Sequence, residues 1–430
     1  ALQAWPSESR QWFQRHGLGD TFRGALSSAD ALAELSPVGL VALLDVLRAA
    51  AGPSLGGGEL LLSPGLVPQL LNLLSENHLR TLQRWPEAHG GGADGAHQLV
   101  DAVITVLYRP LAGSAKAAQD PALKRVQQLL LQERAVSHVV DTLKLLEAHA
   151  LVIPLSFTSR LVLSASAFAH EFMGCGGMGP GLLAKLLAPD NAPSIIVDAL
   201  LILSQLARLS KDNYPRLQEA GVFPRLGALL GHADPGVRAR ACNLVGNLCR
   251  HSAFFYGAIR EQGLLPQLVE RCRDEDRGTR KFACFAIGNS AFHGDSLYAE
   301  LEAAIAPLVG LLQDPDDKTR ANAAGALGNF ARNSGALAQA LVDRGAVQAL
   351  IATLDAPPRG GGGGQQSPMK IALFSLGNAA GHGACREAML ASPAFVEAVQ
   401  GLGRDAAADD VTRKYLERIK VKIWGARSRP

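Results

Sequence analysis

The chain has 430 residues, of which 48% are hydrophobic and only 5% aromatic, and its formal net charge at pH 7 is +3. This composition allows a large core of alanine and leucine, and it lacks the valine-, isoleucine- and threonine-rich runs that are typical of strands. The small net charge favours neither nucleic acid nor a membrane surface as the partner. No stretch of about 18 or more apolar residues and no secretory signal occur, so we expect no membrane span.

Cysteine usage and the first residue add two expectations about context. The chain has 6 cysteines, without a C-x-x-C pair, and most of them lie in or next to predicted helices. We therefore expect buried, reduced thiols in a cytoplasmic protein. The sequence starts at Ala1 without a methionine, so we expect a piece of a longer protein.

Residues 1–190 show helical periodicity without a regular repeat. Glycine runs at 56–58 and 90–92 indicate turns. The segment 64–71 resembles the second helix of a repeat found later in the chain. We therefore predict divergent α-helical repeats here. Apolar residues recur three or four apart in the segments expected to be helices, which are 7–16, 30–51, 66–82, 97–107, 124–148 and 157–172.

A Gly-Asn pair recurs in residues 191–400, with its glycines at Gly246, Gly288, Gly328 and Gly377. The separations of 42, 40 and 49 residues lie within or just beyond the roughly 40 to 47 residues of armadillo and HEAT units. A further repeat is expected at 193–208, ahead of the first pair. The pattern predicts an all-α fold, an armadillo- or HEAT-like right-handed α-solenoid.

Each regular unit is predicted to hold two shorter helices, a turn and a long helix. The long helix is rich in alanine and leucine and ends near the Gly-Asn pair. The helix before it opens with proline in its first turn, as at 263–266, where the missing N–H does no harm. An acidic residue stands four positions before an arginine at the start of the long helix, where its carboxylate caps the N-terminus. These pairs are Asp234 and Arg238, Asp276 and Arg280, and Asp316 and Arg320.

Two segments depart from the repeat. Residues 357–367 contain two prolines and a run of five glycines, so we expect a loop inserted into the regular repeats, which explains the longest spacing. In residues 401–430, the segment 411–424 has Leu416 and Ile419 on an apolar helix side. We predict that this helix caps the last repeat, because end repeats need a polar outer face.

The C-terminal helix also carries the densest basic run of the chain. Its members are Arg413, Lys414, Arg418, Lys420 and Lys422, opposed within the helix only by Glu417. Two interpretations remain open for this run: a solvated helix face, or contact with an acidic partner such as tubulin.

Motifs typical of cofactor or metal sites occur here in the wrong context. Residues 174–179 match the spacing G-x-G-x-x-G, but they follow a helix and not a strand, so a turn is predicted. His251, His293 and His382 follow long helices without a second ligand at metal spacing, so we expect surface or capping histidines. Residues 314–317 lack the further oxygens of an EF-hand loop and predict a turn. We expect no catalytic, cofactor-binding or metal-binding residues in this chain.

The asparagines of the Gly-Asn pairs form the strongest candidate site. Asn247, Asn289, Asn329 and Asn378 occupy one register of successive helices, where an apolar stack would favour alanine over an amide. Two interpretations remain open, and both can hold. Either each amide pairs with a neighbouring carbonyl and stabilises the repeat, or the amides line a concave groove and bind the backbone of an extended partner peptide. Arg238, Arg280 and Arg320 complete this candidate protein-binding groove.

These motifs resemble armadillo repeats over residues 190–400. The importin-alpha type carries a tryptophan four residues before the asparagine, whereas this chain has Asn243, Phe285, Gly325 and Phe374 there. Binding of nuclear signals is therefore not expected. The amino-acid sequences of segments 279–289 and 318–329, together with that of 413–416 near the C-terminus, are similar to the C-terminal armadillo region of the Fused family of serine/threonine kinases.

The resemblance to the Fused family implies a non-catalytic scaffold. Members of that family join an N-terminal kinase domain to such a helical region, bind kinesin-like proteins, and act at the central pair of motile cilia or in plant cytokinesis. This chain contains none of the V-A-I-K, H-R-D and D-F-G elements of a kinase. The resemblance thus implies kinesin-like or other microtubule-associated partners, tubulin among them, and a place in the ciliary axoneme.

Other functions remain open at this stage. The chain fits a different axonemal or catenin-like armadillo adaptor, and it also fits a regulatory solenoid of an otherwise active kinase. Sequence upstream of Ala1 would discriminate between these classes. The patterns do not predict the oligomeric state.

Overall fold

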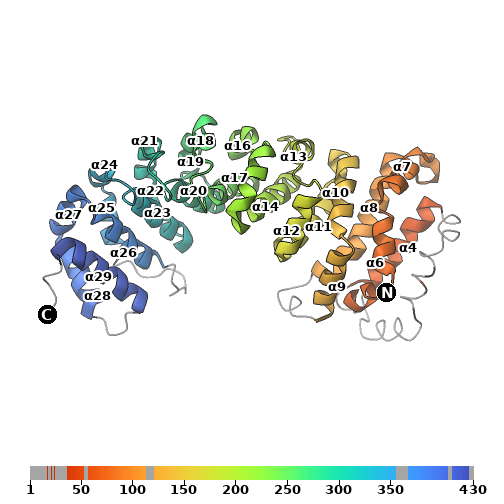
Figure 1. Cartoon of the computed structure of the whole chain (residues 1–430), viewed down its shortest axis with the longest axis horizontal. Coiled ribbons are helices and arrows are strands. Elements are labelled where there is room, and N and C mark those ends of the chain that lie inside the picture. Colours follow the sequence, from red (N-terminus) through yellow and green to blue (C-terminus); the bar gives the residue numbers. More distant parts are fainter. Residues whose placement is uncertain are drawn as a thin grey trace. The chain divides into compact units, whose positions relative to one another are not determined.

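A computed structural model describes Gly17, Thr21, Gly24 and residues 36–52, 57–112, 121–354, 367–404 and 409–425. Within these residues the regular structure is entirely helical, which confirms the predicted all-α fold (Figure 1). The chain divides into two compact units, unit 1 at residues 1–202 and unit 2 at residues 203–430. The division falls inside α14 (Pro193–Leu209), the helix that we expected to begin the regular repeats.

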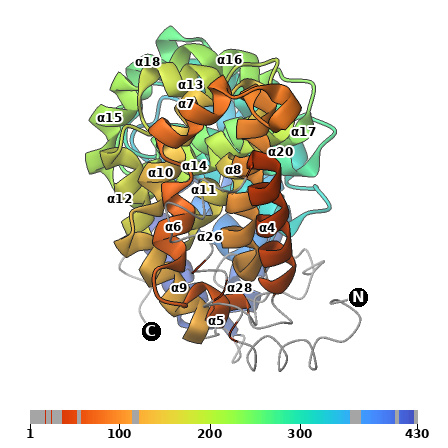
Figure 2. The ribbon, with the colours of Figure 1, turned by 90° about the vertical axis from the view of Figure 1, so that its right-hand side faces the viewer.

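The described residues of unit 1 form helices of unequal length. Figure 2 views this unit from its own end, with α4 beside α8, which it contacts extensively. Leucine, valine and alanine fill the core between these helices, and Leu44, Val103 and Val140 are fully buried. The α-helices bounded by described residues of unit 1 before α14 are α4 (Pro37–Ala50), α5 (Gly57–Leu61), α6 (Leu66–Asn72), α7 (Glu76–Arg84), α8 (Gly92–Tyr108), α9 (Pro121–Gln132), α10 (Ala135–Leu145), α11 (Val152–Ser164), α12 (Ser166–Gly174) and α13 (Pro180–Leu186).

Three of the helices expected in unit 1 are each two helices in the structure. The segment 66–82 is divided between α6 and α7, 124–148 between α9 and α10, and 157–172 between α11 and α12. Arg134 takes a φ of 53° between α9 and α10, and Ala165 is extended between α11 and α12. Periodicity alone does not show such turns, because the apolar pattern continues across them. The segment expected to be helical at 7–16 lies outside the described residues.

Unit 2 repeats the predicted arrangement of two shorter helices, a turn and a long helix. Figure 1 shows α17, α20, α23 and α26 following one another along this unit, and each of them packs on the next. We call these four helices and α29 the third helices. The repeated helices are α15 (Tyr214–Glu219), α16 (Phe223–Leu230) and α17 (Pro235–Leu248); α18 (Tyr256–Glu261), α19 (Leu264–Arg271) and α20 (Arg277–Ser290); α21 (Tyr298–Leu301), α22 (Ile305–Leu311) and α23 (Asp317–Asn329); α24 (Ala338–Asp343), α25 (Ala346–Ala352) and α26 (Pro368–Ala379); and α27 (Gly383–Leu390), α28 (Pro393–Arg404) and α29 (Asp410–Trp424).

The predicted acidic caps are present at the third helices. Asp234, Asp276 and Asp316 accept hydrogen bonds from the third backbone N–H that follows each of them. Such a bond satisfies one of the donors that a helix N-terminus leaves unpaired. Ser367 does the same for α26, so this last residue of the expected inserted loop belongs to the helix. Residues 357–366, the rest of that loop, lie outside the described residues.

The C-terminal helix α29 has the design of another third helix. Asp409 caps it through the backbone N–H of Thr412, as Asp276 caps α20 through Thr279. Leu416 and Ile419 are buried, and α29 packs on α26 and α28. The helix expected to cap the last repeat is therefore itself the third helix of a further unit, α27 to α29.

Cysteine burial follows the expectation from the sequence. All the cysteines are free thiols, and all except Cys175 are buried. Burial raises the pKa of Cys249 to about 12 and that of Cys385 to about 11. These two thiols therefore stay protonated at neutral pH and behave as small apolar side chains.

Glycine allows the third helices to approach closely. A Cβ on Gly246 would lie 2.4 Å from the Phe285 ring, and one on Gly328 would lie 2.7 Å from the Cα of Ser375. Neither position has room for a side chain unless two helices separate. Gly325, one turn before Gly328 on α23, differs, because a Cβ there would meet only Ile371 at an ordinary 3.5 Å.

The contrast between these two glycines predicts opposite effects of one added methyl group. Gly328→Ala should lower the free energy of unfolding by roughly 2 kcal/mol, because it overpacks the contact between α23 and α26. Gly325→Ala should leave it unchanged or raise it by up to about 1 kcal/mol, because alanine is the better helix former. Urea unfolding of the full chain, followed by circular dichroism, measures both. Equal effects of the two substitutions would show that helix propensity, and not helix approach, governs these positions.

Candidate protein-docking face

Three positions of each third helix lie on one side of unit 2. They are the position of the recurring asparagine and the positions four and seven residues before it, a spacing that places side chains on one helix face. We call this set the third-helix face. Its members are Arg240, Asn243 and Asn247 on α17; Phe282, Phe285 and Asn289 on α20; Asn322, Gly325 and Asn329 on α23; Ile371, Phe374 and Asn378 on α26; and Tyr415, Arg418 and Lys422 on α29.

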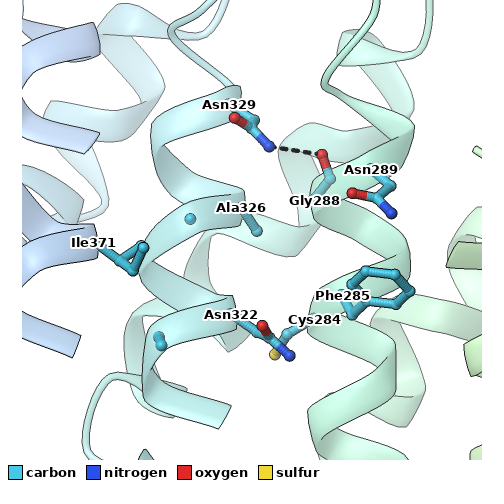
Figure 3. A pocket seen from close by; sticks show the side chains of 10 residues that line it. Cys284, Phe285, Gly288, Asn289, Asn322, Ala326, Asn329 and Ile371 are labelled. Atoms are coloured by element: carbon cyan, nitrogen blue, oxygen red, sulfur yellow. Dashed lines mark hydrogen bonds between the residues drawn. The ribbon is translucent and has the colours of Figure 1, made fainter. Parts of the chain in front are cut away.

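The recurring asparagines hydrogen-bond to the unit before them. The Nδ2 of Asn289 donates to the carbonyl of Gly246 at 2.8 Å, and that of Asn329 to Gly288 at 2.9 Å (Figure 3). Asn378 repeats the contact on Gly328 at 3.1 Å. In each case the acceptor is the glycine of the preceding Gly-Asn pair.

The two ends of this ladder of amides differ from its middle. Asn247 donates instead to Oδ1 of Asn243 on its own helix, at 3.3 Å. On α29 the position is taken by Lys422, whose Nζ donates to the carbonyl of Gly377 at 2.7 Å. Burial lowers the pKa of Lys422, and the neighbouring Arg418 lowers it further. Lysine thus replaces asparagine as the donor in the last described unit.

This ladder supports the structural interpretation of the asparagines without excluding the other one. A side-chain amide has two N–H donors and an oxygen that accepts. The contact with the preceding glycine uses one donor. Asn247, Asn329 and Asn378 are buried, and Asn289 is half-buried. Binding of a partner backbone by this row stays a prediction.

A second ladder, which the sequence analysis did not identify, joins a tyrosine of the first helix to the end of the third helix. The hydroxyl of Tyr214 donates to the carbonyl of Asn247 at 3.2 Å, and that of Tyr256 to Asn289 at 2.7 Å. Tyr298 makes the same bond to Asn329 at 2.5 Å. The tyrosines recur 42 residues apart in the sequence, and this period is the signal that could have revealed them.

The histidines after the third helices are used in the same region. His251 and His293 place Nε2 2.9 and 3.0 Å from the carbonyls of Arg208 and Arg250, one unit earlier. His382 contacts the carbonyl of Ala331 in the same way, at 2.9 Å. These contacts agree with the predicted capping role.

The three arginines of the candidate groove tie the turns together. Arg238 binds Asp274 through two hydrogen bonds of 2.8 Å each, and Arg280 binds Asp314 at 2.8 Å. Arg320 donates to the carbonyl of Asp314 at 2.8 Å and pairs with Asp317. The side chains are 15%, 18% and 4% exposed, so their guanidinium groups serve contacts within the chain. Their part in a partner groove stays a prediction.

The basic residues of α29 divide into two groups. Arg418 donates to Oδ1 of Asn378 at 2.6 Å and lies over the Phe374 ring, and Lys422 is held by Gly377. Arg413 and Lys414 are exposed, and Lys420 is half-buried. Only part of the predicted basic run is therefore placed to meet a partner.

A cavity of about 200 Å³ opens between α20 and α23. Phe285 and Ile371 border it, and Asn289, Asn322 and Asn329 supply its polar groups (Figure 3). The cavity exists because Gly325 has no side chain at the position where α20 and α26 carry Phe285 and Phe374. It is smaller than the roughly 300 to 1,000 Å³ of small-molecule sites, which suits a single side chain.

The remaining motifs form no chemical site in the part of the chain that is described. Residues 174–179 make a turn at the end of α12, where the N–H of Gly177 donates to the carbonyl of Phe172. Across the described ranges, no three His, Cys, Asp or Glu side chains gather as metal ligands. None of the helices described has the length and apolar character needed to cross a membrane.

Comparisons with known proteins agree with this geometry. The family model for HEAT repeats matches residues 223–327 and 265–359. Serine/threonine-protein kinase TIO from Arabidopsis thaliana is 36% identical over 403 residues, which are 84% of this chain and 30% of that protein. The chain thus spans less than a third of the length of this relative. The relative confirms the resemblance to the Fused family.

Solved structures show the same fold. An engineered protein matches 94% of this chain, and 98% of its own, with a TM-score of 0.66 at 20% identity, which shows the fold alone. A designed armadillo repeat protein in complex with the peptide (KR)4 matches 57% of this chain, and 98% of its own, with a TM-score of 0.51 at 26% identity. The predicted armadillo- or HEAT-like α-solenoid is confirmed.

The arginine–aspartate contacts predict a pH-dependent stability. Burial of Asp274 opposes its charge, but hydrogen bonds from Arg238 and from the N–H of Asp276 outweigh it and hold the pKa of this carboxyl below its usual value. A carboxyl with a lowered folded-state pKa stabilises above its unfolded pKa of about 4 and loses that contribution as the pH falls through the folded value. Asp274→Asn should therefore lower the free energy of unfolding by roughly 2 kcal/mol at pH 7.

The difference between wild type and Asp274→Asn should stay constant from about pH 7 to pH 5 and shrink below about pH 4. Urea unfolding at a series of pH values measures it. Asp94→Asn, at an exposed position on α8, is the matched control and should change stability little at any pH. A difference that persists unchanged into acid would mean that the charge of Asp274 contributes nothing.

Proposed function

Because this chain is an α-solenoid of HEAT and armadillo type and a homologue of part of a Fused-family serine/threonine kinase, we propose that it is a non-catalytic scaffold that docks other proteins. The third-helix face of unit 2 is the docking surface. The partner is a kinesin-like or other microtubule-associated protein, tubulin among the candidates. The site of action is a microtubule assembly such as the central pair of the ciliary axoneme.

The observation that carries this proposal is the row of asparagines beside the cavity at Gly325. Their amides stand in one register on consecutive helices, and Asn289 remains partly exposed after donating to Gly246. An extended chain that crosses α17, α20, α23 and α26 would pass one asparagine on each of these helices. Repeat solenoids offer such long surfaces to extended ligands, and the designed armadillo protein with its bound peptide is an example.

A second function is favoured by the relative itself. That protein is named a kinase, and this chain corresponds to 30% of its length. In a longer protein of this kind, the solenoid would regulate a kinase domain by holding its substrate or the domain itself. The same face would serve, so this function differs in its partner and not in its site.

The test uses the face asparagines with a matched control elsewhere in unit 2. Asn289→Ala and Asn329→Ala together remove two amides of the face and two bonds to glycine carbonyls. Asn213→Ala removes a buried bond of the same kind, from Nδ2 of Asn213 to the carbonyl of Leu206 at 2.8 Å, just before α15. Each lost bond should lower the free energy of unfolding by about 1 kcal/mol.

Immobilised full chain is incubated with recombinant kinesin-like proteins and with polymerised tubulin, and the captured fraction is measured. We expect wild type and Asn213→Ala to capture equal fractions of the same partner. The fraction captured by the double variant should be smaller by roughly tenfold or more. Melting temperatures of all variants are recorded in the same buffer. If the double variant captures as much partner as wild type, the docking surface lies elsewhere. If Asn213→Ala also loses capture, the loss comes from lower stability and not from the face.

A further inference from the structure

The third-helix face is basic although the chain as a whole is nearly balanced, with 42 Lys and Arg against 39 Asp and Glu. Its three positions carry Arg240, Arg418 and Lys422, and on the described helices they carry no Asp or Glu. Lys281 and Arg332 adjoin it, one residue before Phe282 and three residues after Asn329. The surface that we propose for docking therefore carries cations and no carboxylates at its three positions.

Besides Arg418, which lies over Phe374 and hydrogen-bonds to Asn378, three of these cations lie against aromatic rings and not against carboxylates. The Nζ of Lys281 is 4.5 Å from the centroid of the Phe282 ring, and the Cζ of Arg240 is 5.7 Å from the same centroid. The Cζ of Arg332 is 3.9 Å from the Phe292 centroid. Among the described residues none of these three side chains forms an ion pair, whereas Arg238, Arg280 and Arg320 all do.

An aromatic ring orients a cation without neutralising it. A cation held over a ring is attracted to the negative face of the ring and keeps its full charge for an anion. Arg240 and Lys281 are both half-buried and share the Phe282 ring, and Arg332 is exposed. The three cations are thus positioned in advance for carboxylates that the described part of the chain does not supply.

The cavity at Gly325 opens on the third-helix face, to which these cations belong or which they adjoin. It lies between α23 and α20, which carries Lys281, and Gly325 stands seven residues before Arg332. Phe285, Ala326 and Ile371 make its walls apolar, and the three asparagines give it a polar rim. An apolar side chain enclosed there would leave the neighbouring residues of the same ligand beside the cations.

We propose that the third-helix face binds an extended acidic segment of the partner protein. Carboxylates of that segment pair with Arg240, Lys281 and Arg332, and one apolar side chain between them fills the cavity at Gly325. The proposal rests on the docking function proposed above and adds the chemistry of the partner. It also sets this chain apart from the designed armadillo protein, whose bound peptide is basic.

A peptide fits this face better than a single-stranded nucleic acid, although aromatic and basic side chains occur together in both kinds of site. A phosphate backbone offers acceptors and no donors to the asparagine row. A peptide backbone offers both, and so matches an amide that donates and accepts. Three unpaired cations over successive units also make too sparse a track for a backbone with one charge on every nucleotide.

The probe is a fluorescein-labelled peptide with one leucine flanked on both sides by glutamates, titrated with the full chain and followed by fluorescence anisotropy. The same peptide with lysine at every glutamate, and an oligouridine of equal length, are the comparison probes. We expect the acidic peptide to bind at least tenfold more tightly than the lysine peptide. Its affinity should fall as salt is added. Tighter binding of the oligouridine, or equal binding of the lysine peptide, overturns the proposal.

Two variants separate the charge from the cavity. Arg240→Glu combined with Arg332→Glu should weaken binding of the acidic peptide by roughly tenfold or more. The control is Arg216→Glu, at an exposed position on α15, which should not change binding. Gly325→Phe places the aromatic side chain of the neighbouring helices into the cavity. This substitution should weaken binding of the leucine peptide severalfold. It should not change the binding of a peptide that has glycine in place of that leucine.

These outcomes decide between the two proposals. No binding of the acidic peptide, or binding that survives both charge reversals, refutes the acidic segment as the ligand. If a kinesin-like partner or tubulin is still captured through Asn289 and Asn329 in that case, the docking function stands with a ligand of different chemistry. Loss of both results means that the third-helix face does not dock proteins. The circular dichroism spectrum and melting temperature of each variant confirm that it is folded.

Discussion

Close approach of the third helices is the constraint on which the rest of unit 2 depends. It requires a residue without a side chain at Gly246 and Gly328, and it brings a glycine carbonyl within reach of an asparagine on the next helix. The helix spacing and the inter-unit hydrogen bond therefore come from the same pair of residues. Replacing the glycine would separate the helices and leave the asparagine amide without its acceptor.

Stacking is reinforced by polar contacts at both ends of the third helix. At the start, Arg238 and Arg280 reach the aspartates of the following turn. At the end, tyrosine hydroxyls and histidine rings satisfy carbonyls that a helix C-terminus leaves unpaired. Because the same bonds recur in successive units, each helix holds the next in one register. Equivalent side chains of the third-helix face consequently line up from one unit to the next.

One departure from the repeat gives that row its most specific feature. Gly325 stands where neighbouring helices carry phenylalanine, and its missing side chain opens the cavity beside Asn329. Without Gly325 the face would be a uniform strip of amides and rings. With it, the face has one position with room for a side chain of a ligand, and the same face carries cations and no carboxylates.

The repeat, its helix types and its caps were readable from the sequence alone, because helix periodicity, N-cap aspartates and the Gly-Asn spacing are local signals that recur. The breaks at Arg134 and Ala165 were not, since an apolar pattern runs through a sharp turn unchanged. The sequence placed the asparagines in one register, but only the packed helices decided that their amides bind glycine carbonyls one unit earlier. The cavity, too, required the tertiary structure, because a glycine opens a space only when Phe285 and Ile371 are held on either side of it.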